Sequence, residues 1–230
     1  MITFNKMDLS KQYNNFAQRF SEIHDVGENS NRDNRKFFYD KLDFIKPGMK
    51  VLDLACGDGL DLAYYKELGA EIYGLDASEE LTKIARERLP GADIRVGLFE
   101  SNPFEDNFFD VVLSKYAIQT SADIKPIFSE IKRVLKPGGI LMYLVTHPLR
   151  QYLEKKNPAI NYFEQRVVDC HILNDTIIVK EPTHTMNEYL SPEFLKSFDV
   201  QEFEECWDAA AEQVDDRKYP GYFILRARKR

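Results

Sequence analysis

The chain has 230 residues, of which 43% are hydrophobic and 30% are charged. This composition is typical of a globular domain and argues against a disordered chain. A chain of this length can bury a full core without disulfide or metal staples. The formal net charge is −7 and the pI is near 5.3. This acidic balance argues against a nucleic-acid-binding protein, because such proteins usually carry a basic surface.

Three widely separated cysteines, Cys56, Cys170 and Cys206, match neither a disulfide framework nor a zinc site. We therefore expect no metal ion. Residues 1–19 contain no apolar core of the kind found in signal peptides. No apolar run approaches the length of about 18 residues that a membrane span needs. These features predict a cytoplasmic protein without a membrane span.

The N-terminal segment, residues 1–46, is predicted to form a helical cap. Its aromatic and aliphatic residues recur at spacings of three and four, which predicts two amphipathic helices. The polar stretch over residues 27–34 predicts a loop between them. Pro47-Gly48 ends this segment.

From residue 50 the pattern changes to short apolar runs that alternate with helical stretches. This alternation predicts βαβ units with a parallel sheet and right-handed crossovers, within a core that spans residues 47–147. The predicted strands and helices are, in chain order, strand 50–54, helix 59–68, strand 71–75, helix 79–89, strand 93–96, strand 109–114, helix 124–134 and strand 140–146.

The segment over residues 148–190 interrupts the alternation. Apolar stretches flank Asn174-Asp175, which predicts a hairpin, and a long insertion of this kind tends to be a lid or a binding element. Ser191-Pro192 predicts a helix start in the last part, residues 191–230, before two final strands. The fold expected is one α/β domain, with a Rossmann-like seven-stranded, mostly parallel sheet and helices on both faces. An N-terminal cap and an insertion after strand five complete it.

The segment VLDLACGDG joins the first predicted strand to the first helix. Gly57 and Gly59 let a ligand approach the backbone closely, at the carboxyl edge of the sheet where ligands bind. The third glycine of the dinucleotide motif is absent. Asp53 and Asp58 would repel a pyrophosphate, but they suit a cofactor with an ammonium and a sulfonium. Asp76, at the end of the second strand, can accept hydrogen bonds from both ribose hydroxyls.

These residues, together with Phe109-Asp110-Val-Val and the Leu-Lys-Pro-Gly-Gly run ending at Gly139, resemble the class I S-adenosylmethionine-dependent methyltransferases of the small-molecule type. The resemblance covers roughly residues 48–146. It implies S-adenosylmethionine as cofactor, with S-adenosylhomocysteine as product. It also implies transfer of the methyl group to an O, N or C nucleophile of a small molecule. The stretch from Tyr13 to Phe20 is similar to the opening that closes over the cofactor in such proteins.

The same resemblance implies a set of cofactor-binding residues. In it, Asp53 holds the methionine ammonium and Asp76 holds the ribose. Leu98 stands where the family often has an acid, so that the adenine would pack against Leu98 or Phe99, with Glu100 as a substitute acid. The full set is Tyr13, Asp53, Ala55, Gly57, Asp58, Gly59, Asp76, Ala77, Leu81, Leu98, Phe99, Ser114 and Lys115.

Candidates for the acceptor side follow the fourth and fifth strands and lie in the insertion. Tyr116 and Gln119 come directly after the fourth strand, and His147 after the fifth. His147 and His184 are candidate bases, because imidazole titrates near neutral pH. Aromatic residues make up 13% of the chain, which favours a partly apolar or aromatic methyl acceptor.

Three alternatives remain open at this stage. The first is a methyltransferase that acts on a macromolecule, either a protein or a tRNA. The acidic pI argues against a tRNA substrate. The second is a non-catalytic cofactor-binding module, to which the substitution at Leu98 points. The third is a nicotinamide-dependent dehydrogenase, disfavoured by the missing glycine. The sequence leaves open the acceptor, its attacking atom, the use of a base and the oligomeric state, although an oligomer is possible.

Overall fold

We analysed a computed structural model of the chain, which describes residues 12–26, 32–154, 161–173, 176–208 and 218–230. The description below concerns these residues. Part of the loop predicted over residues 27–34 and the turn residues Asn174-Asp175 lie outside them.

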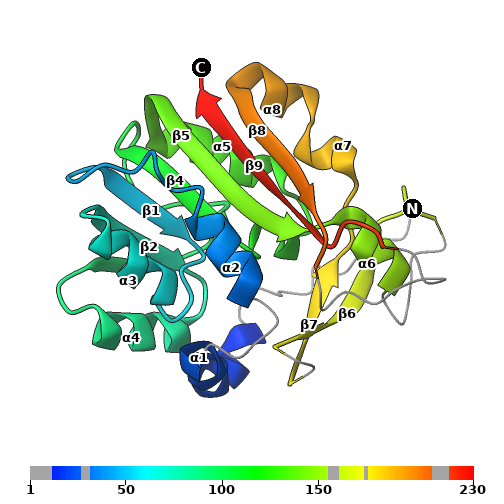
Figure 1. Ribbon diagram of the computed structural model, residues 1–230, viewed down its shortest axis with the longest axis horizontal. Coiled ribbons are helices and arrows are strands. Elements are labelled where there is room, and N and C mark those ends of the chain that lie inside the picture. The colour runs from blue at the N-terminus through cyan, green and yellow to red at the C-terminus, as the bar shows by residue number, and fades with distance from the viewer. Residues whose placement is uncertain (1–11, 27–31, 155–160, 174–175, 209–217) are drawn as a thin grey trace.

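A seven-stranded sheet forms the centre of the molecule (Figure 1). Its strand order is β3-β2-β1-β4-β5-β9-β8. The first five of these strands are parallel, whereas β9 runs antiparallel to both β5 and β8. This confirms the predicted fold class. The strands are β1 (Lys50–Leu54), β2 (Glu71–Asp76), β3 (Asp93–Val96), β4 (Phe109–Lys115), β5 (Leu135–Thr146), β8 (Phe198–Cys206) and β9 (Tyr222–Lys229).

Helices cover both faces of the sheet, and its central strands are therefore apolar on both sides. Along β5, for example, Tyr143 packs in the core under α5, α7 and α8, and Leu144 packs in the core under α2, α3 and α4. The helical elements are η1 (Gln12–Phe16), α1 (Ala17–Val26), α2 (Arg32–Tyr39), α3 (Leu60–Glu67), α4 (Glu79–Arg88), η2 (Ile118–Thr120), α5 (Lys125–Val134), α6 (Pro148–Glu154), α7 (Met186–Tyr189) and α8 (Pro192–Ser197).

The strand order reverses between β1 and β4. The chain builds outward from β1 to β3, then returns to place β4 on the other side of β1. In open parallel sheets this reversal leaves a crevice beyond the carboxyl ends of the two strands, which is where ligands bind. The glycine turn after β1 and the residues after β4 meet at this point.

The fifth strand begins earlier than the sequence pattern predicts. It starts at Leu135 rather than Ile140, because Leu135 pairs with Phe109 before the register shifts. Gly138 takes a φ of 75° within this irregular start. The pairing joins residues far apart in the chain, so local periodicity does not reveal it.

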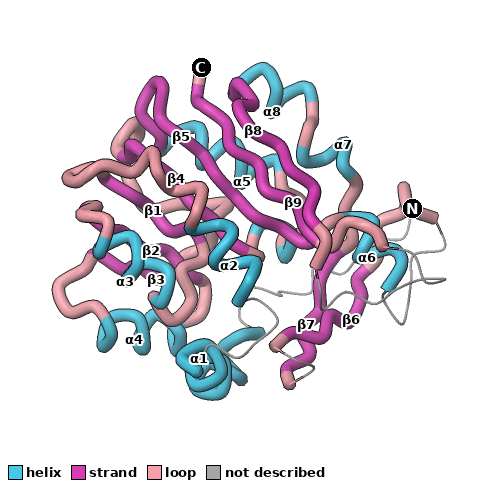
Figure 2. Tube along the Cα trace, viewed as in Figure 1, coloured by secondary structure: helices cyan, strands magenta, loops and turns pink. Residues whose placement is uncertain are grey.

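A separate two-stranded sheet, β6 (Val167–Ile172) with β7 (Ile177–Pro182), forms the hairpin predicted in the insertion (Figure 2). The Gln12 side chain binds the edge of β7 through both of its amide atoms: Nε2 donates to the Lys180 carbonyl at 3.1 Å and Oε1 accepts from the Lys180 N–H at 2.9 Å. Apolar hairpin residues also pack against Tyr13, Phe16 and Phe20. The N-terminal segment and the hairpin thus pack together.

Candidate functional site

The turn after β1 is built from backbone in the left-handed region. Ala55, Gly57 and Gly59 have φ values of 67°, 53° and 78°. Ala55 N–H donates to the Leu75 carbonyl at 2.7 Å, which holds the turn against β2. An alanine in this region costs about 1–2 kcal/mol, and such strain is concentrated at functional sites. A Cβ added at Gly59 would lie 3.0 Å from the Cβ of Ala85.

Asp76 ties the end of β2 to this turn. Its Oδ2 accepts from Gly57 N–H and its Oδ1 from Ser78 N–H, both at 2.8 Å. Burial raises the pKa of Asp76 even though these backbone bonds oppose the shift. Each oxygen keeps lone-pair capacity for a further donor, such as a ribose hydroxyl. Leu81 is buried in the first turn of α4, just after Ala77.

Asp53 carries a buried acceptor that lacks a donor. The residue is only 3% exposed, and its Oδ2 has no hydrogen-bond partner among the residues that the structure describes. Burial, followed by the charge of Asp61, raises the pKa of Asp53 well above its usual value. An unpartnered buried acceptor is costly, and an ammonium group would satisfy it. The site therefore fits the amino-acid end of S-adenosylmethionine.

Two cations pair with Asp61, the acid whose charge acts on Asp53. Lys115, at the end of β4, places Nζ 2.6 Å from Asp61 Oδ2, and Arg35 of α2 places Nε 3.2 Å from Asp61 Oδ1. Against the effect of burial, these two cations hold the pKa of Asp61 well below its usual value. The backbone of Lys115 is expected near the methionine end of the cofactor, and its side chain pairs with Asp61, an acid that no sequence motif marks.

Asp58 anchors the N-terminal cap. It lies 3.2 Å from His24 Nδ1 and accepts from Arg88 at 3.2 Å and from the Leu60 N–H at 3.3 Å. Although burial opposes it, the His24 hydrogen bond keeps the pKa of Asp58 below its usual value. These contacts make Asp58 an anchor that joins α1 and α4 to the glycine turn, and its role as a cofactor ligand stays a prediction.

The cap lies directly over the glycine turn. A Cβ added at Gly57 would lie 3.8 Å from Cε1 of Phe20. The rings of Tyr13 and Phe20 meet edge to face at 5.8 Å. Burial, and after it the charge of Glu181, raises the pKa of Tyr13 well above its usual value. The Tyr13–Phe20 segment is therefore placed as a cover for this turn.

The loop after β3 presents apolar surface. Leu98 is 44% exposed, and Phe99 packs against the core under α5. Glu100 accepts from the Ser121 hydroxyl, so it is already partnered. Ser114 Oγ donates to the Leu54 carbonyl at 2.9 Å, and its hydroxyl thus joins β4 to β1.

Tyr116 follows β4 in a strained conformation, with a φ of 53°. Its hydroxyl accepts from Asn34 Nδ2 of α2 at 2.9 Å. Burial raises the pKa of Tyr116 well above its usual value, so the phenol stays protonated. That proton remains able to donate to another group.

The structure does not bring the two candidate histidine bases together. His147 Nδ1 accepts from the Leu149 N–H at 3.0 Å, so Nε2 is the nitrogen that bonds Glu205 at 2.8 Å. His184 contacts the Gln119 carbonyl and Glu188 through its two nitrogens. A base needs a nitrogen that can reach the acceptor proton. These contacts anchor both imidazoles, and a role for either one as the base stays a prediction.

Sequence reasoning missed several residues of this region. All lie in the cap, in α3 or α4, or in the insertion, where no local motif marks them. Only their tertiary contacts reveal them, and they are His24, Arg35, Asp61, Arg88, Gln151 and Glu181.

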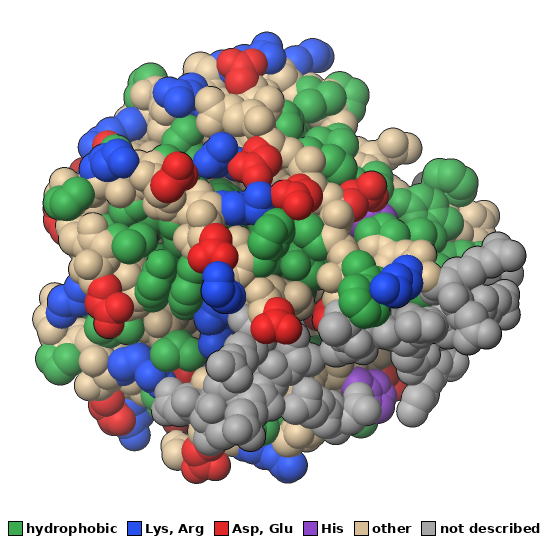
Figure 3. All heavy atoms as spheres, viewed as in Figure 1, with side chains coloured by type: hydrophobic (Ala, Val, Ile, Leu, Met, Phe, Trp, Pro, Cys, Tyr) green, Lys and Arg blue, Asp and Glu red, His purple; other side chains and the backbone are tan. Residues whose placement is uncertain are grey.

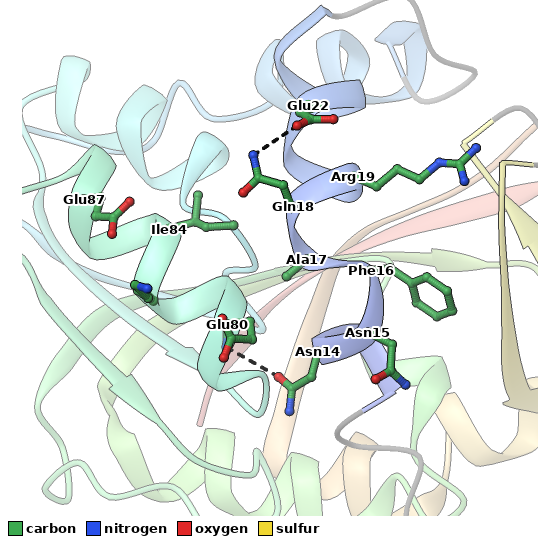
Figure 4. A pocket seen from close by; sticks show the side chains of 11 residues that line it. Asn14, Asn15, Phe16, Ala17, Gln18, Arg19, Glu22, Glu80, Ile84 and Glu87 are labelled. Carbon is green, nitrogen blue, oxygen red and sulfur yellow. Dashed lines mark hydrogen bonds between the residues drawn. The ribbon is translucent and has the colours of Figure 1, made fainter.

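A groove of about 910 Å³ runs between η1–α1 and α4 (Figure 4). Its sides carry mixed charges, including Arg19, Glu22 and Glu87, and the Asn14 side chain accepts from the Glu80 N–H at 3.4 Å across one end. None of the glycine-turn residues lines it. The groove is therefore distinct from the site at the carboxyl edge.

Comparisons with known proteins agree with this geometry. Residues 52–143 match the family described as methyltransferase domain. An uncharacterized methyltransferase of Synechocystis sp. is 42% identical over 105 residues, which are 45% of this chain and 50% of that protein. The demethylmenaquinone methyltransferase of Paenarthrobacter aurescens is 29% identical over 66% of this chain and 64% of its own length. The chain thus spans about half to two thirds of these curated relatives.

Solved structures share the fold. The S-adenosylmethionine-dependent methyltransferase from Mesorhizobium loti matches with a TM-score of 0.67 and 22% identity, over 80% of this chain and 92% of that one. The chain therefore has the Rossmann-like fold of methyltransferases of known structure. Residues 52–143 are similar to the methyltransferase domain family. No helix among the described residues is long and apolar enough to span a bilayer.

Proposed function

We propose that this chain transfers a methyl group from S-adenosylmethionine to an O, N or C nucleophile of a small molecule. The observation that carries the proposal is the unpartnered Oδ2 of Asp53, buried next to a glycine turn that is hydrogen-bonded to Asp76. A nicotinamide dinucleotide would bring a pyrophosphate to this turn, where the nearby acids Asp53 and Asp76 could not neutralise its charge. The ammonium of an amino-acid group would instead satisfy the Oδ2 atom of Asp53.

The residues of the chain have binding and shielding roles in this reaction. Asp53 accepts from the methionine ammonium, Asp76 from the ribose, and the backbone at Gly57 lies along the methionine chain. When bound, S-adenosylmethionine supplies a methyl group on a sulfonium, ready for in-line displacement by a nucleophile. The cap and the hairpin hold the acceptor in line and exclude water, which are the main contributions that such a displacement needs.

A small, partly aromatic acceptor is the class we favour. Three observations support it. Relatives carry names of quinone-pathway enzymes, such as demethylmenaquinone methyltransferase. Phe16 and Phe20 of the cap pack against apolar residues of the hairpin, so the contact between these two parts of the cover is apolar. On the described part of the face in Figure 3, acidic and basic side chains are interspersed rather than gathered into a basic surface for a nucleic acid.

The first test is isothermal titration with S-adenosylmethionine, S-adenosylhomocysteine and NAD. We expect micromolar binding of the two adenosyl ligands and none of NAD. Asp76→Ala should weaken binding by about 1–3 kcal/mol, because buried hydrogen-bond partners, including the ribose hydroxyls, would lose their acceptor. Methyl incorporation into dihydroxynaphthalenes then tests the acceptor class. Absence of adenosyl-ligand binding by the folded protein would refute the proposal.

A further inference from the structure

A buried polar cluster lies between the hairpin and the segments that follow β4 and β5. It consists of Gln119, Gln151, Glu181 and His184, each at most 2% exposed. Gln151 Nε2 lies 3.4 Å from Glu181 Oε2, and Gln151 Oε1 accepts from the His184 N–H at 3.3 Å. His184 Nε2 lies 3.1 Å from the Gln119 carbonyl oxygen. The four residues are therefore linked.

Within this cluster, acceptors outnumber the donors that reach them. Glu181 lacks a cationic partner among the described residues, and its single side-chain contact is the long one from Gln151. Gln151 Nε2 also donates to the Pro182 carbonyl at 3.2 Å. The Oε1 atom of Gln119 is buried with no partner in the part of the chain that the structure describes. Buried acceptors that lack donors are costly and call for an explanation.

The cluster includes segments that follow the carboxyl ends of β4 and β5, at the edge where open parallel sheets bind their ligands. Gln119 lies in η2, which follows β4, and Gln151 lies in α6, which follows β5. Glu181 comes from β7, which contacts both η1 and η2. Tyr13 of η1 packs against the apolar residues of the hairpin. Glu181 thus lies in a strand that packs against the cap segment over the glycine turn.

We propose that Glu181 is the residue that recognises the methyl acceptor, by accepting a hydrogen bond from an O–H or N–H group of that molecule. Gln119 Oε1 is a second acceptor for the same ligand. The inference rests on the proposed function and deepens it: the acceptor carries a hydroxyl or an amine donor next to its apolar part. Gln151 is a positioning residue, because it holds Glu181 and the chain at His184.

A purely structural role and a ligand-binding role for Glu181 predict opposite effects of its replacement on stability. If the buried carboxylate stabilises the fold, replacing it lowers the stability of the protein. If it is kept to bind a ligand, it destabilises the ligand-free protein, and replacing it does not lower the stability. Glu181→Gln keeps the size and an acceptor for Gln151. We expect its Tm to be unchanged or higher than that of the wild type. Gln119→Met, which removes the unpartnered oxygen, should likewise leave the Tm unchanged or higher.

Binding is measured on the full chain saturated with S-adenosylhomocysteine. The probes are 2-naphthol and 2-phenylethylamine, each with its fully methylated counterpart, 2-methoxynaphthalene and the trimethylammonium derivative. We expect at least one donor-bearing probe to bind the wild type better than its methylated counterpart. Its affinity should fall at least tenfold in Glu181→Gln. Glu105→Gln, the same change at an exposed position, is the control and should bind as the wild type does.

Binding of naphthol alone assigns a neutral hydroxyl acceptor, and binding of the amine alone assigns a cationic one. The proposal is overturned if no donor-bearing probe is preferred, if Glu181→Gln binds the probes as the wild type does, or if that variant loses several degrees of Tm. S-adenosylhomocysteine should bind the wild type and Glu181→Gln equally. Loss of that binding in the wild type would instead refute the proposed function itself.

Discussion

The guanidinium of Arg35 donates to Nε2 of His24 across a distance of 2.7 Å. Since arginine only donates, Nε2 must be an acceptor, and the proton of the ring lies on Nδ1, 3.2 Å from Asp58. His24 is therefore neutral in the docked cap. Burial lowers the pKa of His24, in opposition to the hydrogen bond that His24 donates to Asp58. Two cap helices are thus joined to the glycine turn through a neutral imidazole.

This arrangement makes the stability of the protein dependent on pH. The pKa of His24 is lower in the folded protein than its ordinary value of about 6.5, so the unfolded chain binds the extra proton more readily. The contribution of neutral His24 to the free energy of unfolding is present above about pH 6.5. This contribution is lost as the pH falls toward the pKa of His24 in the folded protein. The free energy of unfolding, measured in urea from pH 7.5 to 5, should fall less in His24→Gln than in the wild type. His171→Gln, in the hairpin, is the control, and equal slopes for His24→Gln and the wild type would contradict the assignment.

Binding of S-adenosylmethionine should release a proton from Asp53. Burial raises the pKa of Asp53 in the empty site, and an ammonium beside it favours the ionised form. Affinity should therefore rise with pH through the range in which the empty site is protonated. Titrations in phosphate and in Tris should give different enthalpies. Asp53→Asn should weaken binding by about 1.5–3 kcal/mol and lose this buffer dependence. Identical enthalpies in both buffers for the wild type would show that Asp53 is already ionised.

Gly57 and Gly59 should respond differently to alanine. Both have a positive φ, which costs any other residue about 1–2 kcal/mol. Only at Gly59 would the new Cβ press on Ala85, at 3.0 Å. Gly59→Ala should therefore lose about 1–3 kcal/mol more unfolding free energy than Gly57→Ala. Urea unfolding of the two variants tests this, and equal losses would mean that α4 moves away freely.

The amide of Gln12 should control how firmly the hairpin is held. Both of its polar atoms bond the backbone of Lys180. Gln12→Leu keeps a side chain of similar size but removes the two hydrogen bonds. We expect faster amide hydrogen exchange over residues 167–182, with global stability nearly unchanged. Gln18→Leu, whose amide bonds only Glu22, is the matched control. Unchanged exchange at the hairpin would show that the apolar cluster alone holds it.

The bounds of some strands and helices could be predicted closely from the sequence. The bounds of β1 and β3 agree with the expected ones. For β1 the reason is local, because a strand buried on both faces is an almost continuous apolar run. Ser191 and Pro192 mark the start of α8 for an equally local reason, since the Ser191 hydroxyl accepts from the Phe194 N–H within the first turn. Signals of this kind need no knowledge of the rest of the fold.

The histidines show where such reasoning ends. An imidazole after β5 has the right chemistry for a base, but the Leu149 N–H and Glu205 both bond the ring of His147. The Glu205 partner comes from β8, 58 residues along the chain. The sequence could not single out Glu181 either, because a glutamate in a strand of the insertion becomes a candidate only when its burial is known.

The sequence by itself determined the parallel core, the glycine turn and the acid after β2, and thereby the cofactor class. Those features depend on neighbouring residues and on apolar periodicity. Tertiary structure alone decided which charged groups are paired and which buried acceptors lack a donor, as Asp61 with Lys115 and Asp53 show. The physical reason is that a side chain's protonation and hydrogen bonding depend on groups brought near it by folding, and these lie far away in the chain.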